Sequence, residues 1–159
     1  MRTWLIFAGL ALSLGVPFGL VAQKERVRAT GTRVLLPLAP VDPRSLIQGD
    51  YMILAYALVR ELPDFREWPR DGELVVRVDA DAVASFARRN DGQPLQPGEQ
   101  LLRYRIRANG LRLGAEAFHF QEGKAGYFQR ARFGELRVTS SGDSQLVGLS
   151  DEQRQPLDH

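Results

Sequence analysis

The sequence contains no cysteine, which excludes disulfide bonds and any chemistry that depends on a thiol. Its two histidines, His119 and His159, are too few for a multi-histidine metal site, and we expect neither a metal nor a cofactor. Lysine is equally scarce, with only Lys24 and Lys124. A serine–lysine catalytic pair needs a lysine in an apolar setting that lowers its pKa, and neither lysine has such a sequence context.

The chain also lacks a strong charge of either sign. Its net charge of +2 at pH 7 is small, and the arginines are spread among acidic and apolar residues, so we expect no nucleic-acid binding. Charged residues make up 25% and hydrophobic residues 44%, as in an ordinary globular domain. The 159 residues predict three parts: an N-terminal anchor (1–23), one β-rich domain (24–150) and a loose polar tail (151–159).

Residues 4–22 form the longest hydrophobic run, and they contain no charged side chain. The run is close to the roughly 20 residues that a membrane-spanning helix needs. Cleavage after Ala22 would place Leu20 at the −3 position, where a signal-peptide cleavage site favours a small residue. We therefore interpret the run as a retained transmembrane helix in contact with membrane lipid.

Short alternating segments between turn residues predict a mainly β domain, a small antiparallel sandwich or open barrel. Alternation is clearest over residues 73–80 and 100–107, and Asn109-Gly110 predicts a type I′ hairpin after the latter. Other expected strands cover residues 27–38, 51–59, 83–88, 117–120, 132–139 and 145–149, and one short helix covers residues 122–131. Apolar residues of 51–62 also share a helical stripe, so the second half of strand 51–59 is open to either structure.

Residues 49–56 read Gly-Asp-Tyr-Met-Ile-Leu-Ala-Tyr, a polar turn that enters an apolar strand. Related blocks occur before it at residues 39–45 (Ala-Pro-Val-Asp-Pro-Arg-Ser) and after it at residues 118–123 (Phe-His-Phe-Gln-Glu-Gly) and 131–138. Together with the N-terminal apolar run, these blocks resemble the bacterial GDYxxLxY proteins over nearly the whole chain. The resemblance implies a membrane-associated protein that accompanies a multi-pass membrane protein, and it identifies no catalytic residue.

The basic residues that follow the apolar run outnumber Arg2 before it, which alone would place the domain in the cytoplasm. A basic residue followed directly by an apolar segment is also the pattern of an export signal. Because the resemblance favours export, we expect a single-pass inner-membrane protein whose domain lies on the periplasmic side.

The candidate binding residues come from two blocks: Gly49, Asp50, Tyr51, Leu54, Tyr56, His119, Glu122 and Gly123. Each also has a purely structural interpretation, which we favour. Asp50 would accept backbone amides in the turn, and Tyr51 would pack with its hydroxyl in water. Tyr56 would belong to the core, and His119 would lie on the face opposite to its phenylalanine neighbours. Glu122-Gly123 would begin the short helix, with the carboxylate near its positive end.

Arg103, Arg105 and Arg107 form a basic stripe on one face of a predicted strand. Such a stripe either meets phospholipid headgroups or an acidic partner, or is simply solvated, and solvation is the default.

The leading functional hypothesis is a membrane-anchored, non-catalytic accessory or binding domain that partners a multi-pass membrane protein. One alternative is a hydrolase similar to the membrane-bound signal peptidases, with Ser45 as nucleophile. Ser45 lies too close to Gly49-Asp50 for that pattern, and Val41 stands where the nucleophile belongs. A second alternative, a free periplasmic ligand-binding domain, requires cleavage near Ala22.

Overall fold

The computed structural model describes residues 13, 18, 24–25, 27–39, 47–48 and 51–157. The predicted anchor, apart from Ser13 and Phe18, therefore lies outside the described residues, as do Gly49, Asp50, Ser45 and His159. Within the described part of the chain, no helix combines the length and the apolar character that crossing a membrane requires.

The domain is mainly β, as the sequence predicts, and the strands of its described residues pair in three curled antiparallel sheets. The strands are β1 (Thr32–Pro37), β2 (Ile47–Gln48), β3 (Tyr51–Ile53), β4 (Asp71–Val78), β5 (Ala84–Arg89), β6 (Glu99–Arg107), β7 (Gly110–Arg112), β8 (Ala117–His119), β9 (Phe133–Val138), β10 (Ser144–Ser150) and β11 (Pro156–Leu157). Two short helices, α3 (Ala57–Glu61) and α4 (Ala125–Phe128), lie between strands.

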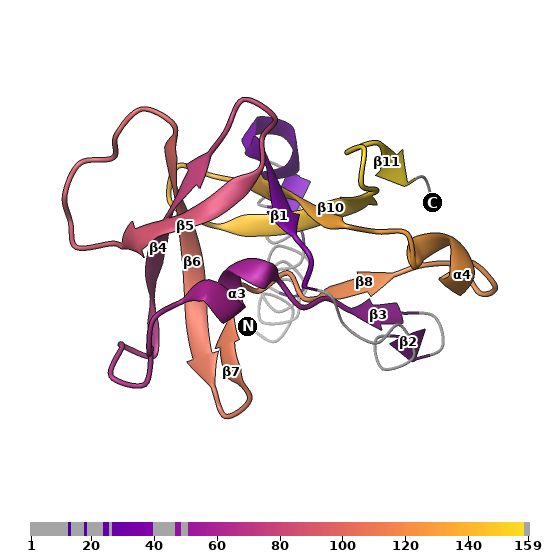
Figure 1. Ribbon diagram of the computed structural model, residues 1–159, viewed down its shortest axis with the longest axis horizontal. Helices are drawn as coiled ribbons and strands as arrows, with labels where there is room; N and C mark the ends of the chain where they lie inside the picture. The colour runs from indigo at the N-terminus through magenta and orange to yellow at the C-terminus, as the bar shows by residue number, and fades with distance from the viewer. Residues whose placement is uncertain are drawn as a thin grey trace, which may run out of the picture.

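The sheet β1-β9-β10-β11 lies in the middle of the domain, with β5-β4-β6-β7 on one side and β2-β3-β8 on the other (Figure 1). Backbone hydrogen bonds join the sheets. Leu35 N donates to Ala82 O at 2.7 Å on one side of β1, and Ala39 N donates to Ala55 O at 2.7 Å beyond its end. Irregular register within β4–β5 and β9–β10 marks β-bulges, which increase strand twist and so help the sheets to curl.

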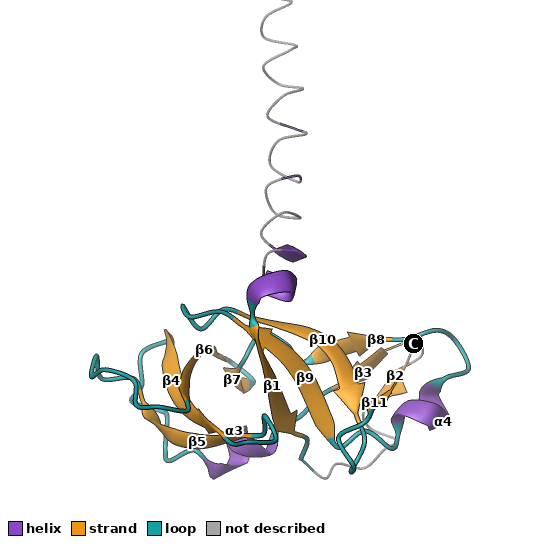
Figure 2. Cartoon of the chain, turned by 90° about the horizontal axis from the view of Figure 1, so that it is seen from above, coloured by secondary structure: helices purple, strands orange, loops and turns teal. Residues whose placement is uncertain are grey.

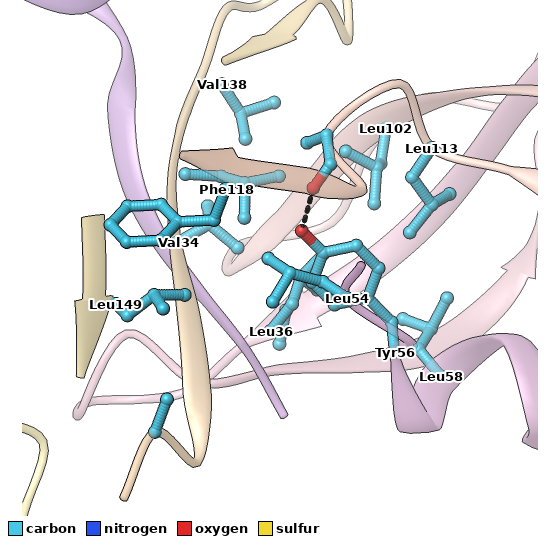
Figure 3. Packing of buried hydrophobic residues seen from close by; sticks show 14 of the residues in the cluster. Val34, Leu36, Leu54, Tyr56, Leu58, Leu102, Leu113, Phe118, Val138 and Leu149 are labelled. Carbon is cyan, nitrogen blue, oxygen red and sulfur yellow. Dashed lines mark hydrogen bonds between the residues drawn. The ribbon is translucent and has the colours of Figure 1, made fainter. Parts of the chain in front are cut away.

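One hydrophobic core is shared by all three sheets (Figure 3). Its members that are no more than 2% exposed are Val34, Leu36, Leu54, Tyr56, Leu58, Leu74, Val76, Ala84, Leu102, Tyr104, Phe128, Leu136, Val138 and Leu149. Alternate residues of β1, β4 and β9 point into this core, as expected for extended chains. In β1 and β4 the intervening residues, Leu35 and Val75, are buried as well, so both faces of these strands are covered.

Residues 27–30 are helical, so the prediction of a strand from residue 27 is wrong for its first turn. Gly31 N donates to Val27 O at 2.9 Å and ends this turn immediately before β1. A Cβ atom on Gly31 would lie 2.6 Å from Val27 O and 2.9 Å from the Cβ of Arg137. Glycine therefore lets the helical turn end in close contact with β9. We call residues 27–30 the N-terminal helical turn.

Two other expectations need correction. The segment after β3 is not a strand through residue 59, because α3 begins at Ala57 and buries Leu58, as the helical stripe allowed. The β6–β7 hairpin forms as predicted, but Arg107 pairs with Gly110, which leaves Ala108 and Asn109 as the loop. Positive φ occurs at Gly110 (104°) rather than at the two loop residues, so the turn is not type I′.

The chain beyond residue 150 is more ordered than its polar composition predicts. Pro156 and Leu157 form β11, which pairs with Ser150 and Leu149 of β10. Leu157 is 4% exposed and belongs to the core. The one sequence feature that could have predicted this order is Leu157 among polar residues. Burial of its side chain in the core explains why the segment packs against β10.

Candidate functional site

The second half of the 49–56 motif is part of the core. Leu54 and Tyr56 are each 2% exposed, and the Tyr56 hydroxyl donates to the carbonyl of Ala115 (Figure 3). Burial raises the pKa of Tyr56 well above its usual range, and the charge of Glu116 adds to the effect. The phenol is therefore a neutral hydrogen-bond donor that ties the motif to the β7–β8 connection.

That connection is itself held rigidly by Glu116. Its Oε1 accepts hydrogen bonds from Leu113 N and from Gly114 N, the latter at 3.1 Å. Its backbone carbonyl accepts Leu54 N at 2.7 Å. Tyr56 and Glu116 thus fix the segment from residue 113 to 116 against the motif from two directions.

Two residues of the motif, Tyr51 and Ile53, face outward from the β3–β8 pair. In the β3–β8 register, Tyr51 lies opposite His119 and Ile53 opposite Ala117, while Met52 and Phe118 lie opposite each other on the buried face. The rings of Tyr51 and His119 are 5.7 Å apart between centroids. The two blocks singled out in the sequence therefore meet, and His119 is exposed between buried phenylalanines as expected.

Glu122 and Gly123 do not join this face, and their expected role at a helix start is wrong. Helix α4 begins at Ala125 with Lys124 as its N-cap, and no acidic residue lies in its first turn. Glu122 is exposed, and Gly123 (φ 84°) belongs to the turn in which Lys124 N donates to Gln121 O at 3.1 Å. Phe128 instead attaches α4, with its ring 5.1 Å from that of Phe118 between centroids.

A groove of about 680 Å³ opens over the outward face of β3 and β8. The N-terminal helical turn, the β7–β8 connection and the start of β10 form its other walls. The described residues that line it are Lys24, Val27, Tyr51, Ile53, Arg112, Gly114, Ala115, Glu116, Ala117, Asp143, Ser144, Gln145 and Leu146. The helical turn stands at the start of β1, beside the sheet that contains β10 (Figure 2). We call this cavity the helix-base groove.

The acidic and the basic side chains of the helix-base groove differ in whether they have interaction partners. Among the described lining residues two are acidic, and both have partners: Glu116 accepts hydrogen bonds from backbone amides, and Asp143 accepts one from Arg103 at 2.6 Å. Its two cations, Lys24 and Arg112, form no ion pair within the described part of the chain. The groove therefore combines apolar walls with two available positive charges.

The expected basic stripe on β6 is largely neutralised. Arg103 pairs with Asp143 and lies 3.7 Å from Glu73, and Arg105 pairs with Asp71 at 3.1 Å. These acids come from β4 and from the β9–β10 turn. Arg112 was missed because it belongs to the returning strand β7, where it lies opposite Arg105. Its only sequence signal was its position in the predicted hairpin.

Other polar clusters outside the groove are structural in character. Glu99 accepts Gln96 N at 3.0 Å and pairs with Arg88 at 3.2 Å, and these contacts lower its pKa against the opposing effect of desolvation. Across the described ranges, no three histidine, aspartate or glutamate side chains lie close enough together to hold a metal ion.

Comparison with known proteins adds one finding. A family model described as "GDYXXLXY protein" matches residues 13–149. Searches of curated proteins and of solved structures give no match.

Proposed function

The chain belongs to the GDYXXLXY protein family, and from that starting point we propose that it is a membrane-anchored accessory domain. In this proposal residues 4–22 span the inner membrane once, and the β-rich domain lies on the periplasmic side. The domain has no catalytic role of its own and binds a multi-pass membrane protein in the same bilayer.

The observation that carries the proposal is the position of the helix-base groove relative to the apolar run. Lys24 and Val27, which line the groove, follow Ala22 by two and five residues. At no more than about 3.6 Å per residue, Lys24 is within about 7 Å of the end of the run in any backbone conformation. A concave, partly apolar surface therefore lies next to the proposed bilayer, where a membrane-embedded partner is accessible.

Partnership is tested by purifying the tagged full-length protein from native membranes in mild detergent and identifying what accompanies it by mass spectrometry. We expect one multi-pass membrane protein in stoichiometric amount. A mock purification from cells without the tag is the control for background. Recovery of this protein alone, from membranes in which it is abundant, would contradict the accessory role.

Anchoring is tested by moving one positive charge along the apolar run. An arginine near the centre of a spanning helix costs about 2.5–3.5 kcal/mol, whereas one at the end is tolerated. We expect Leu12→Arg to shift full-length protein from the membrane fraction to the soluble fraction, and Gln23→Arg to leave it in the membrane. Equal behaviour of the two variants, or wild-type protein in the soluble fraction, would refute the anchor.

The absence of cysteine makes the orientation directly measurable. Leu95 is 41% exposed in the loop between β5 and β6, so Leu95→Cys supplies one accessible thiol. We expect a membrane-impermeant maleimide to label it in intact spheroplasts as fully as in lysed ones. Labelling only after lysis would place the domain in the cytoplasm.

A further inference from the structure

We propose that the helix-base groove binds the headgroup of an anionic phospholipid from the bilayer that carries the anchor. This inference rests on the proposed membrane anchoring, but it does not depend on the identity or existence of a protein partner.

The charge balance of the groove calls for an anion. Glu116 Oε1 accepts backbone amides and Asp143 Oδ1 accepts Arg103, and neither carboxylate forms an ion pair with a groove cation among the described residues. Lys24, which precedes the N-terminal helical turn, and Arg112 of β7 line the same cavity, and they have no ion-pair partner among the described residues. A phosphate group between them would receive charge-assisted hydrogen bonds from both sides.

The walls indicate that the anion belongs to an amphiphile. Val27, Ile53 and Leu146 supply apolar surface beside the two cations, and Ile53 is 37% exposed although it is a large aliphatic residue. A free inorganic anion would gain nothing from these side chains, whereas the glycerol and first acyl carbons of a lipid would cover them. Tyr51 extends the same face with an aromatic ring and a polar hydroxyl, a combination enriched at membrane interfaces.

The location favours a bilayer lipid over a soluble one. Lys24 lies two residues beyond the apolar run, which places it at the level of the headgroups once the run spans the membrane. Basic residues at this level attract anionic lipids, and each contributes roughly fivefold in affinity. Both cations line the groove together with Tyr51, Ile53 and Ala117, so a lipid held by both would lie against the outward face of β3 and β8.

The test uses full-length protein with one introduced cysteine, Ala117→Cys, labelled with an environment-sensitive fluorophore. Ala117 is exposed and lines the groove, so the label reports occupation directly. The protein is incorporated into nanodiscs of phosphatidylcholine in which phosphatidylglycerol replaces a graded fraction of the lipid. We expect the fluorescence to change with the phosphatidylglycerol fraction, and Arg112→Gln to require about five times more of this lipid for the same change.

Arg107→Gln is the matched control. Arg107 belongs to the same hairpin and also has no ion pair in the described structure, but it does not line the helix-base groove. We expect it to respond like the parent, and all variants to retain the same thermal unfolding midpoint. Equal loss of response in the two arginine variants would overturn the proposal, because it would indicate general surface attraction.

Two further outcomes would also overturn it. If inorganic phosphate added to phosphatidylcholine discs produces the full fluorescence change, the groove takes a free anion and not a lipid. If phosphatidylglycerol produces no change in protein that is incorporated into discs, the groove does not bind lipid, while the anchor stands. Failure of the protein to enter discs would instead refute the proposed anchoring, so the two failures are distinguishable.

Discussion

Replacing Tyr56 by phenylalanine isolates the hydrogen bond that fastens the motif to the β7–β8 connection. The substitution keeps the ring among Leu36, Leu54 and Leu58 and removes only the hydroxyl (Figure 3). It leaves the buried carbonyl of Ala115 without the donor it now has. Loss of a partner from a buried polar group costs about 1–3 kcal/mol, which corresponds to a fall of about 4–12 °C in Tm.

The free energy of unfolding in urea is compared between Tyr56→Phe and Tyr104→Phe. The comparison separates the cost of losing this hydrogen bond from the general cost of removing a tyrosine hydroxyl. Both tyrosines are 2% exposed, but the Tyr104 hydroxyl makes no hydrogen bond within the described part of the chain. We therefore expect Tyr104→Phe to change the free energy of unfolding by less than about 0.5 kcal/mol. If the two variants lose equal stability, the bond from Tyr56 to Ala115 contributes nothing and the reasoning is wrong.

The same residue predicts a loss of stability in alkali. Burial raises the pKa of Tyr56 in the folded protein, whereas the unfolded chain releases this proton near pH 10. The stabilisation from the neutral phenol is complete below about pH 10 and falls by up to about 1.4 kcal/mol per pH unit above it. Burial also raises the pKa of Tyr104, in wild type and variant alike. The free energy of unfolding is therefore measured against pH above about pH 10 for wild type and Tyr56→Phe, and the difference between the two slopes reports the ionisation of Tyr56. Identical slopes would refute the prediction that Tyr56 causes the loss of stability.

Three further substitutions test the packing. A Cβ atom on Gly134 would lie 3.0 Å from the Tyr56 ring, so Gly134→Ala should lower the free energy of unfolding in urea by about 1–3 kcal/mol. A Cβ atom on Gly148 would meet nothing within 4 Å, so Gly148→Ala should lower it by less than half as much. Ser150 is fully buried, and its hydroxyl has no partner among the described residues, so Ser150→Ala should leave Tm unchanged or raise it, and a fall would contradict this assignment. Leu157→Ala should lower the free energy of unfolding by about 2–4 kcal/mol, and no change by calorimetry would mean that β11 does not contribute to the core.

Alternation of apolar and polar residues predicted the strands well where one face of the strand is buried and the other is exposed to solvent. Leu102 and Tyr104 are buried between exposed arginines, and the alternation alone placed β6. The interpretation of Tyr56 as a core residue is confirmed by its burial, and that of His119 as outward-facing by its exposure. Both follow from the period of the side chains along an extended chain.

Features that depend on distant partners could not be predicted in this way. The stripe from Arg103 to Arg107 is locally basic, but its acids come from β4 and from Asp143, which is 40 positions from Arg103. The helix-base groove likewise combines Lys24 with side chains of β3, β7 and β10. No local property of the sequence indicates that these segments meet, because their approach is set by the pairing of whole strands.

The pairing of β1 with β9 has a consequence for how the chain is made. Arg33 and Glu135, which form an ion pair at 3.0 Å across this ladder, are 102 positions apart. A ribosome that adds about 5–20 residues per second needs roughly 5–20 s to synthesise that interval. During this time Val34, Leu35 and Leu36, which lie in the part of the domain that emerges first, have no β9 to pair with. Until β9 is made and this long loop closes, the β1 segment is exposed to aggregation, and the proposed attachment to a bilayer would limit the encounters of one nascent β1 segment with another.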